Sequence, residues 1–183
     1  MKFEEKTIRL KNGEFAVLRS PKIEDAADLI ENIKITCTET HFLSSYPEEY
    51  ENFTVEKEEK WIKNNLESQN SLLIVCEVNR TIAGTCGLNF ETSIKTAHRA
   101  SFGLSIKKKY WNLGIGSAMI EEIITVSRAR GIEIMELTYA EGNERGRRLY
   151  EKFGFRIVSE RPDIYKLKDG TKLKEIYMQK YLK

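Results

Sequence analysis

Residues 107–122, KKKYWNLGIGSAMIEE, decide the fold, because a charged and aromatic loop here runs into a helix-patterned segment through two glycines. Gly114 and Gly116 carry no side chain that would keep another molecule away from the backbone. A helix N-terminus offers unpaired N–H groups and a partial positive charge, so phosphates bind there when glycine allows close approach. The stretch predicts an anion-binding turn. A tight strand-to-helix turn without a ligand is the alternative.

The segments on either side of this turn alternate between strand and helix patterns, which predicts an α/β chain. Upstream, the patterns predict a hairpin around Asn12-Gly13, a helix from Glu24, a loop over 38–53, a helix over 54–68, a hairpin around Asn79-Arg80 and a strand over 100–106. Downstream, they predict a helix over 116–130, a strand over 132–140, a short helix from an Asn143 cap to Gly154 and two strands joined at Asp169-Gly170.

Length and composition fit one globular domain spanning 1–183, with 40% apolar residues to form a core. The net charge is only +2, which gives no argument for nucleic acid or membrane partners. The N-terminus has no apolar signal-peptide region, and no apolar run approaches the ~20 residues of a membrane helix. The three cysteines show no C-x-x-C spacing and predict reduced thiols in a cytoplasmic protein, without a metal site.

Two known phosphate-binding motifs can be compared with the glycine turn. A Walker A loop needs G-x-x-x-x-G-K-[ST], which is absent. A Rossmann turn needs a third glycine where Met119 stands, and a strand that leads straight into the first glycine, whereas the loop KKKYWNL intervenes. Glu136 does lie about 20 residues downstream, as a Rossmann ribose ligand would. The Rossmann reading is therefore weakened but stays open.

The glycine turn and the later segment NERGRRLYEKFGF together resemble the GNAT superfamily of acyl-CoA N-acyltransferases. The signature is an aliphatic strand end, an aromatic residue, a [Q/R]-x-x-G-x-[G/A] turn, an Asn about 30 residues on, a Tyr seven residues later and then Gly-Phe. The matching residues are Ile106, Tyr110, Gly114, Gly116, Asn143, Tyr150 and Gly154-Phe155. This chain departs from the pattern at Trp111, in the [Q/R] position, and at Gly146, where alanine is common.

The resemblance covers nearly the whole chain and implies the α/β (α+β) GNAT fold. Its central sheet is mixed, mostly antiparallel and splayed into a V, with about six to seven strands and about four flanking helices. The strand that ends at Ile106 and the strand over 132–140 would form the V.

The same resemblance implies acetyl-CoA as cosubstrate. The backbone of Leu104, Ser105 and Ile106 would pair with the pantetheine arm, which Asn143 would also approach. The pyrophosphate would be held by the N–H groups of Asn112, Leu113, Gly114, Ile115, Gly116 and Ser117. Basic side chains that could meet the phosphates are Lys107, Lys108, Lys109, Arg147, Arg148 and Lys152. Most of these are expected to be solvated, and Lys152 or Arg148 is the preferred contact.

Acetyl transfer to an amine needs a proton removed from the amine and a proton for the departing thiolate. The resemblance assigns the acid role to Tyr150, whereas helical periodicity alone would place this side chain in the core. Family positions for a glutamate base hold Thr138 and Ser101. The remaining candidates are Glu39, His41, Glu77, His98 and Glu136, and a chain of waters is an equal alternative.

The predicted function is therefore an N-acetyltransferase in which a primary amine attacks acetyl-CoA directly within a ternary complex. The acceptor would be a small molecule or a protein N-terminus, and a homodimer would fit the family. Acidic residues Glu48, Glu49 and Glu51 predict a cationic acceptor, unless their loop is simply solvated. A non-catalytic acyl-CoA sensor or scaffold is the alternative, because Thr138 and Ser101 leave the base positions empty.

Overall fold

The computed structural model describes residues 1–182 and confirms the α/β class. The strands are β1 (Lys6–Arg9), β2 (Phe15–Arg19), β3 (Ser71–Val78), β4 (Thr81–Phe90), β5 (Arg99–Ile106), β6 (Ile134–Ala140), β7 (Arg156–Lys166) and β8 (Lys172–Tyr181). The helices are α1 (Ala26–Glu39), α2 (Val55–Glu67), α3 (Ile115–Ala129) and α4 (Glu144–Lys152). Short 3₁₀ turns are η1 (Ile23–Asp25), η2 (Pro47–Tyr50) and η3 (Lys108–Tyr110).

All strands of the described chain, residues 1–182, lie in one eight-stranded sheet of order β1-β2-β3-β4-β5-β6-β8-β7. The sheet is larger than the six to seven strands expected, because the N-terminal and C-terminal hairpins both join it. β5 and β6 are parallel, and each other neighbouring pair is antiparallel. A doubly wound Rossmann sheet is parallel, so this topology shows that the Rossmann alternative is wrong.

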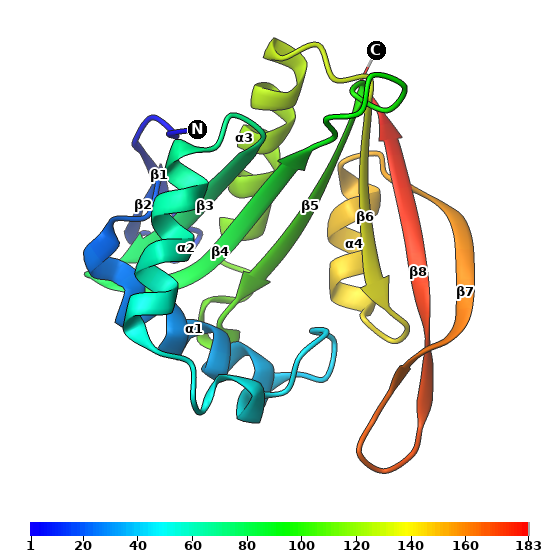
Figure 1. Ribbon diagram of the computed structural model, residues 1–183, viewed down its shortest axis with the longest axis horizontal. Coiled ribbons are helices and arrows are strands. Elements are labelled where there is room, and N and C mark those ends of the chain that lie inside the picture. The colour runs from blue at the N-terminus through cyan, green and yellow to red at the C-terminus, as the bar shows by residue number, and fades with distance from the viewer. Residues whose placement is uncertain (183) are drawn as a thin grey trace.

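The sheet opens between β5 and β6. The two strands pair only from Arg99 opposite Ile134 to Ser101 opposite Glu136, although β5 continues to Ile106 and β6 to Ala140. Figure 1 shows them meeting at one end and diverging toward the other. This is the predicted V, and it leaves one edge of a central strand unpaired in the middle of the protein.

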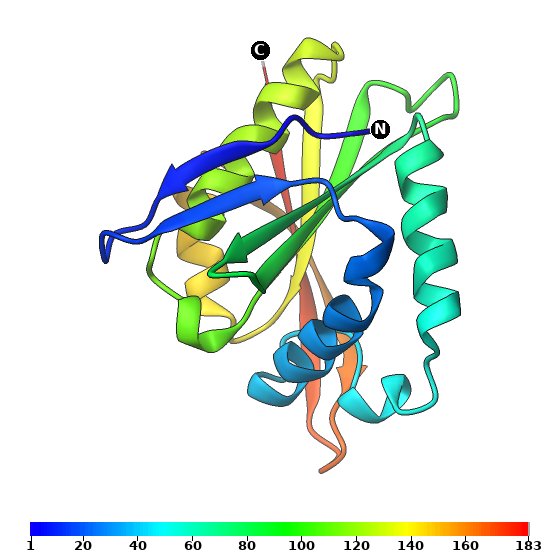
Figure 2. The same ribbon diagram turned by 90° about the vertical axis from the view of Figure 1, so that its left-hand side faces the viewer.

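Helices cover both faces of the sheet, as Figure 2 shows, with α1 and α2 on one side and α3 and α4 on the other. The main core lies under α3, where Met119, Ile120 and Ile123 pack against the sheet with no exposed surface. Burial of side chains of this size stabilises a fold by about 1.5–3 kcal/mol each. A smaller cluster joins α1 and α2 to Val75 and Ile82. The tight packing of α3 fixes its N-terminus at the open end of the V.

Most element boundaries fall within two residues of the predicted ones. The first helix begins as η1, where the Asp25 carboxylate accepts a hydrogen bond from the Lys22 N–H (2.6 Å), and α1 follows from Ala26. The segment predicted as a loop, 38–53, contains the end of α1 and η2, in which Glu49 accepts from the Tyr46 N–H (2.6 Å). Among residues 1–182 the structure contains no helix long and apolar enough to cross a membrane.

Candidate active site

The glycine turn owes its shape to Gly114, which precedes α3 with φ of +100°. This left-handed conformation is disfavoured for residues with a Cβ. Asn112 also has a positive φ, +62°, and asparagine tolerates it better than most residues. The first helical hydrogen bond runs from the Ala118 N–H to the Gly114 carbonyl oxygen (3.0 Å). The N–H groups before Ala118 therefore precede the first bond of the helix and point out of its N-terminus.

Gly116 serves a different purpose from Gly114. A Cβ at Gly116 would lie 2.9 Å from Leu149 Cδ2 and 3.4 Å from Ile106 Cδ1, so its absence lets α3 pack closely on α4 and β5. A Cβ at Gly114 would lie 4.0 Å from Lys11 Cγ, its nearest neighbour among the described residues. Of the two glycines, Gly114 therefore leaves open space at the turn, and Gly116 is required by side-chain packing.

The loop before Gly114 is held in place by several elements. The Trp111 indole Nε1 donates to the Ile106 carbonyl oxygen (2.7 Å), and the Arg145 guanidinium lies 3.5 Å from the ring centroid of Trp111. The Lys11 N–H, from the β1–β2 turn, donates to the Leu113 carbonyl oxygen (3.0 Å). The departure from the family motif at Trp111 thus has a structural role, because the indole closes the loop onto the end of β5.

The free edge of β5 can be assigned residue by residue. The Lys107 N–H donates to Ala83 O (2.9 Å), so the backbone groups of Lys107 point toward β4. Since backbone groups alternate along a strand, those of Ser105 also point toward β4, and those of Leu104 and Ile106 point into the V. The Ser105 hydroxyl lies 3.1 Å from Thr85 Oγ1. The Leu104 N–H and C=O and the Ile106 N–H are therefore the groups that face the gap.

Asn143 caps α4, because its Oδ1 accepts a hydrogen bond from the Gly146 N–H (3.0 Å). A Cβ at Gly146 would lie 2.8 Å from Asn143 Nδ2, so the unusual glycine at 146 makes room for the cap. The Asn143 Nδ2 group has no hydrogen-bond partner within residues 1–182.

The basic residues near the turn differ in environment. Lys152 Nζ lies 3.3 Å from Ser117 Oγ, which places a cation beside the first turn of α3. Arg147 is paired instead with Glu151 (2.8 Å), and Arg148 is exposed on the same helix. Lys107 is an exception to the expectation that most of these residues are solvated, because it is only 6% exposed. Burial lowers the pKa of Lys107, as does Lys109, although acidic residues of α1 oppose the change.

Tyr150 lies beside the V, on the face of the sheet covered by α3 and α4. Its ring centroid is 6.0 Å from those of Phe102 and Tyr139, and the residue is 7% exposed. Burial raises the pKa of Tyr150 well above its usual value, and Cys86 and Tyr139 contribute to this change. Its hydroxyl has no hydrogen-bond partner within residues 1–182. The phenol is therefore a protonated donor without an intramolecular acceptor.

The carboxylates considered as bases are already engaged. Arg19 binds Glu77 (2.7 Å) and also Asp25 (2.6 Å). Glu136 accepts from Arg99 Nη2 (2.6 Å) and from the Tyr177 hydroxyl (2.6 Å).

The other base candidates are not better placed. Glu39 accepts from the Lys108 N–H (2.5 Å) at the loop after β5. The His41 ring packs on Phe42, with 4.4 Å between the ring centroids. His98 lies just before Arg99, at the closed end of the V.

A polar row on β8 was missed in the sequence. Glu175, Tyr177 and Gln179 share the face opposite the core residues Ile176 and Met178. Glu175 is 6% exposed, and it binds Arg161 and accepts a hydrogen bond from the Tyr165 hydroxyl (3.2 Å). The alternation KLKEIYMQKY contains the signal, because three polar side chains at every second position predict a polar face.

The acidic loop residues predicted to attract a cation have local partners. Glu48 pairs with Lys168 Nζ (2.5 Å) in the β7–β8 turn, and the Lys168 N–H donates to the Tyr46 hydroxyl (3.0 Å). Glu49 closes η2, and Glu51 is exposed. These contacts weaken the argument for a cationic acceptor, because Glu48 is already paired with a cation of the β7–β8 turn and Glu49 is engaged within η2.

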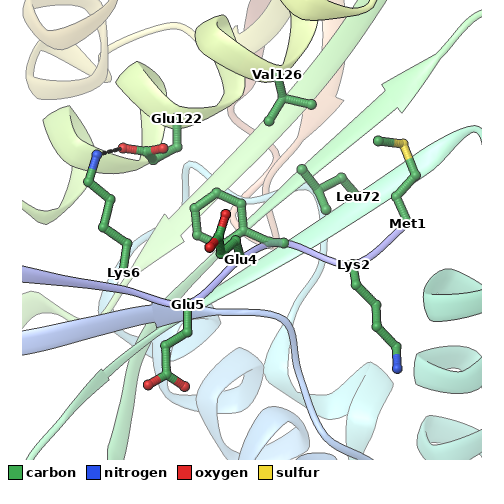
Figure 3. A pocket seen from close by; sticks show the side chains of 9 residues that line it. Met1, Lys2, Glu4, Glu5, Lys6, Leu72, Glu122 and Val126 are labelled. Carbon is green, nitrogen blue, oxygen red and sulfur yellow. Dashed lines mark hydrogen bonds and ion pairs between the residues drawn. The ribbon is translucent and has the colours of Figure 1, made fainter.

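Two hollows of the surface lie away from the backbone groups predicted to hold acetyl-CoA. One of about 370 Å³ lies between the N-terminal segment, Leu72 of β3 and α3, where Figure 3 shows Lys6 reaching Glu122. A second of about 510 Å³ lies along α3 and includes Lys152. Neither is lined by the residues predicted for the cofactor backbone contacts. These two hollows therefore do not mark the predicted site, which is located by the strand register and the N-terminus of α3.

A mixed sheet that splays beside an open helix N-terminus is the architecture of the N-acyltransferase class. The chain belongs to the acetyltransferase (GNAT) family, because the model of that family matches residues 36–155. A GNAT-family acetyltransferase from Streptococcus pneumoniae has 27% sequence identity and a TM-score of 0.83, over 91% of this chain and 99% of that one.

Two further relatives are more distant. A putative acetyltransferase of Salmonella typhimurium, solved with acetyl-CoA, has a TM-score of 0.77 and 16% identity, over 92% of this chain and 94% of that one. The L-amino acid N-acetyltransferase AaaT of Escherichia coli is 25% identical over 107 residues, which are 58% of this chain. The match spans 65% of the length of AaaT.

Proposed function

We propose that this protein transfers the acetyl group of acetyl-CoA to a primary amine of a small molecule or a protein N-terminus, by direct attack in a ternary complex. The observation that carries the proposal is the free edge of β5, which runs straight into the open N-terminus of α3. The acetyl-CoA in the Salmonella relative supports the donor, and the activity of AaaT supports an amine acceptor.

The chemistry of the donor set fits acetyl-CoA. An amide-bearing arm matches the Leu104 N–H and C=O and the Ile106 N–H, as an added strand would. A pyrophosphate matches the N–H groups of 112–117 and the partial positive charge of α3, with the Lys152 ammonium beside them. Asn143 Nδ2 remains a free donor near the start of α4. Ser105, which was also predicted to pair with the arm through its backbone, would not do so, because its backbone groups face β4.

Bound acetyl-CoA would supply an activated acyl carbon as a thioester. In the overall reaction a C–N bond forms and the C–S bond breaks, the amine loses a proton and the sulfur gains one. The chain offers no acyl-accepting thiol near neutral pH, because burial raises the pKa of Cys76 and of Cys86 to about 12. Cys37 is buried as well, and burial also raises its pKa. These properties favour direct attack over an acetyl-cysteine route.

Tyr150 would serve as a hydrogen-bond donor to the departing sulfur. A thiol has a pKa near 8.5 and an ordinary phenol near 10. Proton transfer to the thiolate would therefore be unfavourable even from a phenol whose pKa is not shifted. Burial raises the pKa of Tyr150 further. The hydroxyl is therefore suited to stabilise the thiolate by donation, and the sulfur can take its final proton from solvent.

The proton of the attacking amine would leave through water. The carboxylates of Glu77 and Glu136 are held by arginines, and Glu39 by the Lys108 N–H. The water route, one of the alternatives that the sequence left open, is the one these contacts support best.

The test is a continuous assay of free thiol with acetyl-CoA and a panel of amines that includes amino acids, peptides, polyamines and aminoglycosides. We expect CoA release with at least one acceptor and a mass increase of one acetyl group on that acceptor. Tight CoA binding without turnover for any amine would support the non-catalytic sensor instead. Failure to bind CoA at all would contradict both readings.

We further propose that residues 1–183 act as one acetyltransferase unit. The strands outside the family match, β1, β2, β7 and β8, belong to the same sheet as β3 to β6, which supports this proposal. Three buried, unpaired cysteines suit a reducing compartment, which supports the cytoplasm as its location. Sedimentation analysis would test the homodimer expected from the family resemblance.

A further inference from the structure

Two glycines lie opposite each other in the central strands, Gly87 of β4 and Gly103 of β5. Neither has a positive φ, so the backbone conformation does not require glycine. A Cβ on either would have no heavy atom within 4 Å among residues 1–182, apart from adjoining residues. Gly84 of β4 differs, because a Cβ there would lie 2.4 Å from the Ser105 carbonyl oxygen. Packing explains Gly84 and leaves the Gly87–Gly103 pair unexplained.

Glycine inside a strand carries an entropic cost and often marks a place where a ligand or another backbone approaches closely. The adjoining residues Cys86, Leu88 and Phe102 are buried in the core under α3 and α4. Since side chains alternate across a strand, Gly87 and Gly103 lie on the opposite face, toward the side of α1 and α2. Gly103 is exposed there, at the centre of the sheet.

Gly87 and Gly103 together form a patch of the sheet surface without side chains. This patch lies where the acetyl end of acetyl-CoA would be placed. The pyrophosphate site over 112–117 lies beyond Ile106, so an arm along Leu104 and Ile106 would place its acetyl end toward Gly103. Ser101, two residues further, is the last β5 residue paired with β6. Tyr150 packs on Phe102, on the other face of the sheet. The hydrogen-bond donor to sulfur and the patch would thus lie on opposite faces of the acyl group.

The patch offers space without a free charge. Arg99 is neutralised by Glu136 (2.6 Å), and the Ser105 and Thr85 hydroxyls bond each other (3.1 Å). An uncharged group with some bulk matches these surroundings, whereas neither β4 nor β5 contains an acidic residue that could pair with an ammonium group. Such a group is the substituent on the carbon that bears the reacting nitrogen.

We propose that Gly87 and Gly103 form the floor of the acceptor site and that the acceptor is a primary amine with an uncharged substituent on its amine-bearing carbon. This inference rests on the proposed function. The side chain of a free amino acid and the side chain of the first residue of a polypeptide are both such substituents. A linear diamine or polyamine has an unbranched CH2 at this carbon and a second ammonium group, which no acidic residue of β4 or β5 would neutralise, so we expect it to be a poorer acceptor.

The experiment compares wild type with Gly103→Ala, Gly103→Val and Gly87→Ala, using glycine, alanine, methionine and phenylalanine as acceptors, each free and as the first residue of a peptide, together with a linear diamine. We expect wild type to prefer substituted acceptors. Gly103→Val should lower kcat/KM for the bulkier acceptors by roughly 10-fold or more and leave the value for glycine nearly unchanged, since lost pocket space of this size is worth about 10–200-fold.

Two control measurements separate binding-site effects from damage to the fold. Acetyl-CoA affinity by calorimetry should be unchanged in each variant, and Gly103→Ala should raise Tm slightly, because strand glycines are costly. Gly84→Ala, in the same strand pair, should instead lower Tm.

A uniform loss for all acceptors after Gly103→Val, or a wild-type preference for the diamine, would overturn the inference while leaving the acetyltransferase assignment intact. No CoA release with any amine would overturn the proposed function itself. If the inference holds, the relative kcat/KM values for free amino acids and for peptides show whether the acceptor is a free amino acid or the first residue of a polypeptide.

Discussion

The two ends of the β5–β6 pair use the same backbone for different purposes. At the closed end, Arg99 to Ser101 have strand partners, and Glu136 joins the strands through Arg99 and Tyr177. At the open end, Leu104 and Ile106 face a gap instead of a strand. The contrast indicates that polar side-chain contacts hold the closed end together. At the open end, backbone hydrogen-bond donors and acceptors stay free, whereas in a complete sheet they would be paired with the next strand.

The difference also explains how an open edge can exist inside a sheet. An unpaired edge is exposed to unwanted strand pairing, and proteins limit this risk by covering or shortening such edges. Here Trp111 and η3 close the far end of β5, and α4 lies behind the gap between β5 and β6. The edge is thereby limited to a short segment, which matches the length of a small arm better than that of another strand.

Of the changes considered at the open end, a substitution at Gly114 should have the largest effect on CoA affinity. Gly114→Val places a β-branched side chain at φ of +100°, which costs about 1–2 kcal/mol. Displacement of the N–H groups would remove anion contacts worth up to ~2 kcal/mol. The φ strain lowers stability, whereas the lost anion contacts alone correspond to a loss of CoA affinity of roughly 30-fold. The new side chain would also occupy space that the pyrophosphate needs, which would increase this loss. Isothermal calorimetry with CoA measures it.

A matched control for this variant lies at the other end of the same helix. Gly131 also has a positive φ, +76°, and a Cβ there would meet no heavy atom within 4 Å in the described chain. Gly131→Val should lower Tm in the same way but leave CoA affinity unchanged. Equal affinity in both variants and wild type would remove the turn as the phosphate site.

The second prediction tests the chemistry beside the open end. Tyr150→Phe removes one hydroxyl that has no partner within residues 1–182, so Tm should barely change. Acetyl-CoA should bind almost as well, whereas kcat should fall roughly 100-fold, at the low end of the ~10²–10⁴-fold typical of positioned proton donors. Because burial raises the Tyr150 pKa, wild-type activity should show no loss from tyrosine ionisation up to pH 10.

An intact kcat in Tyr150→Phe would show that the phenol only packs in the core. Tyr139→Phe is the matched control, since Tyr139 is equally buried and contacts the Tyr150 ring. It should keep both kcat and CoA affinity near the wild-type values.

The third prediction concerns the closed end. Glu136→Ala leaves Arg99 and Tyr177 without their acceptor, and hydrogen bonds to charged groups are worth about 1.5–3 kcal/mol. Because Arg99 is partly exposed, we expect a loss of about 2 kcal/mol in the free energy of unfolding, measured by urea denaturation. CoA affinity of the folded variant should change much less.

The comparison variant is Glu160→Ala, which breaks an exposed pair with Lys174 (3.0 Å) and should have no measurable effect on stability. Equal stability of the two variants would mean that the polar contacts at Glu136 do not hold the strands together. A loss of CoA affinity as large as that of Gly114→Val would mean that the closed end shapes the cofactor site directly.

Local patterns predicted most of the fold because they are set by neighbours in sequence. The Asn143 cap and the positive-φ glycines at 114, 131 and 154 fixed helix ends, and the Asn12-Gly13 and Asn79-Arg80 turns fixed hairpins. The two terminal hairpins were predicted as strands, but their joining of one sheet depends on long-range pairing that no local pattern contains.

The site was less predictable, because its roles depend on distant contacts. The motif located Gly114, but only the packing of Leu149 shows that Gly116 has a different role. Most of the basic residues near the turn were expected to be solvated, yet the end of β5 turns Lys107 toward α1, where it is buried. Residues Glu175 and Tyr177 were missed because their partners are brought together by the sheet.

The smallest expected effect separates the two cations considered for the phosphates. Lys152 Nζ lies 3.3 Å from Ser117 Oγ, whereas Arg148 is exposed and makes no hydrogen bond or ion pair with α3 within residues 1–182. An exposed charge at a helix N-terminus is worth about 0.5–1 kcal/mol, so Lys152→Ala should weaken CoA binding roughly two- to fivefold. The difference in CoA affinity between Lys152→Ala and wild type should vanish near 1 M salt, where the Debye length is about 3 Å. Arg148→Ala should leave affinity unchanged at any salt concentration. An equal loss in both variants would indicate a diffuse positive field, and a loss in Arg148→Ala alone would move the phosphate site along α4.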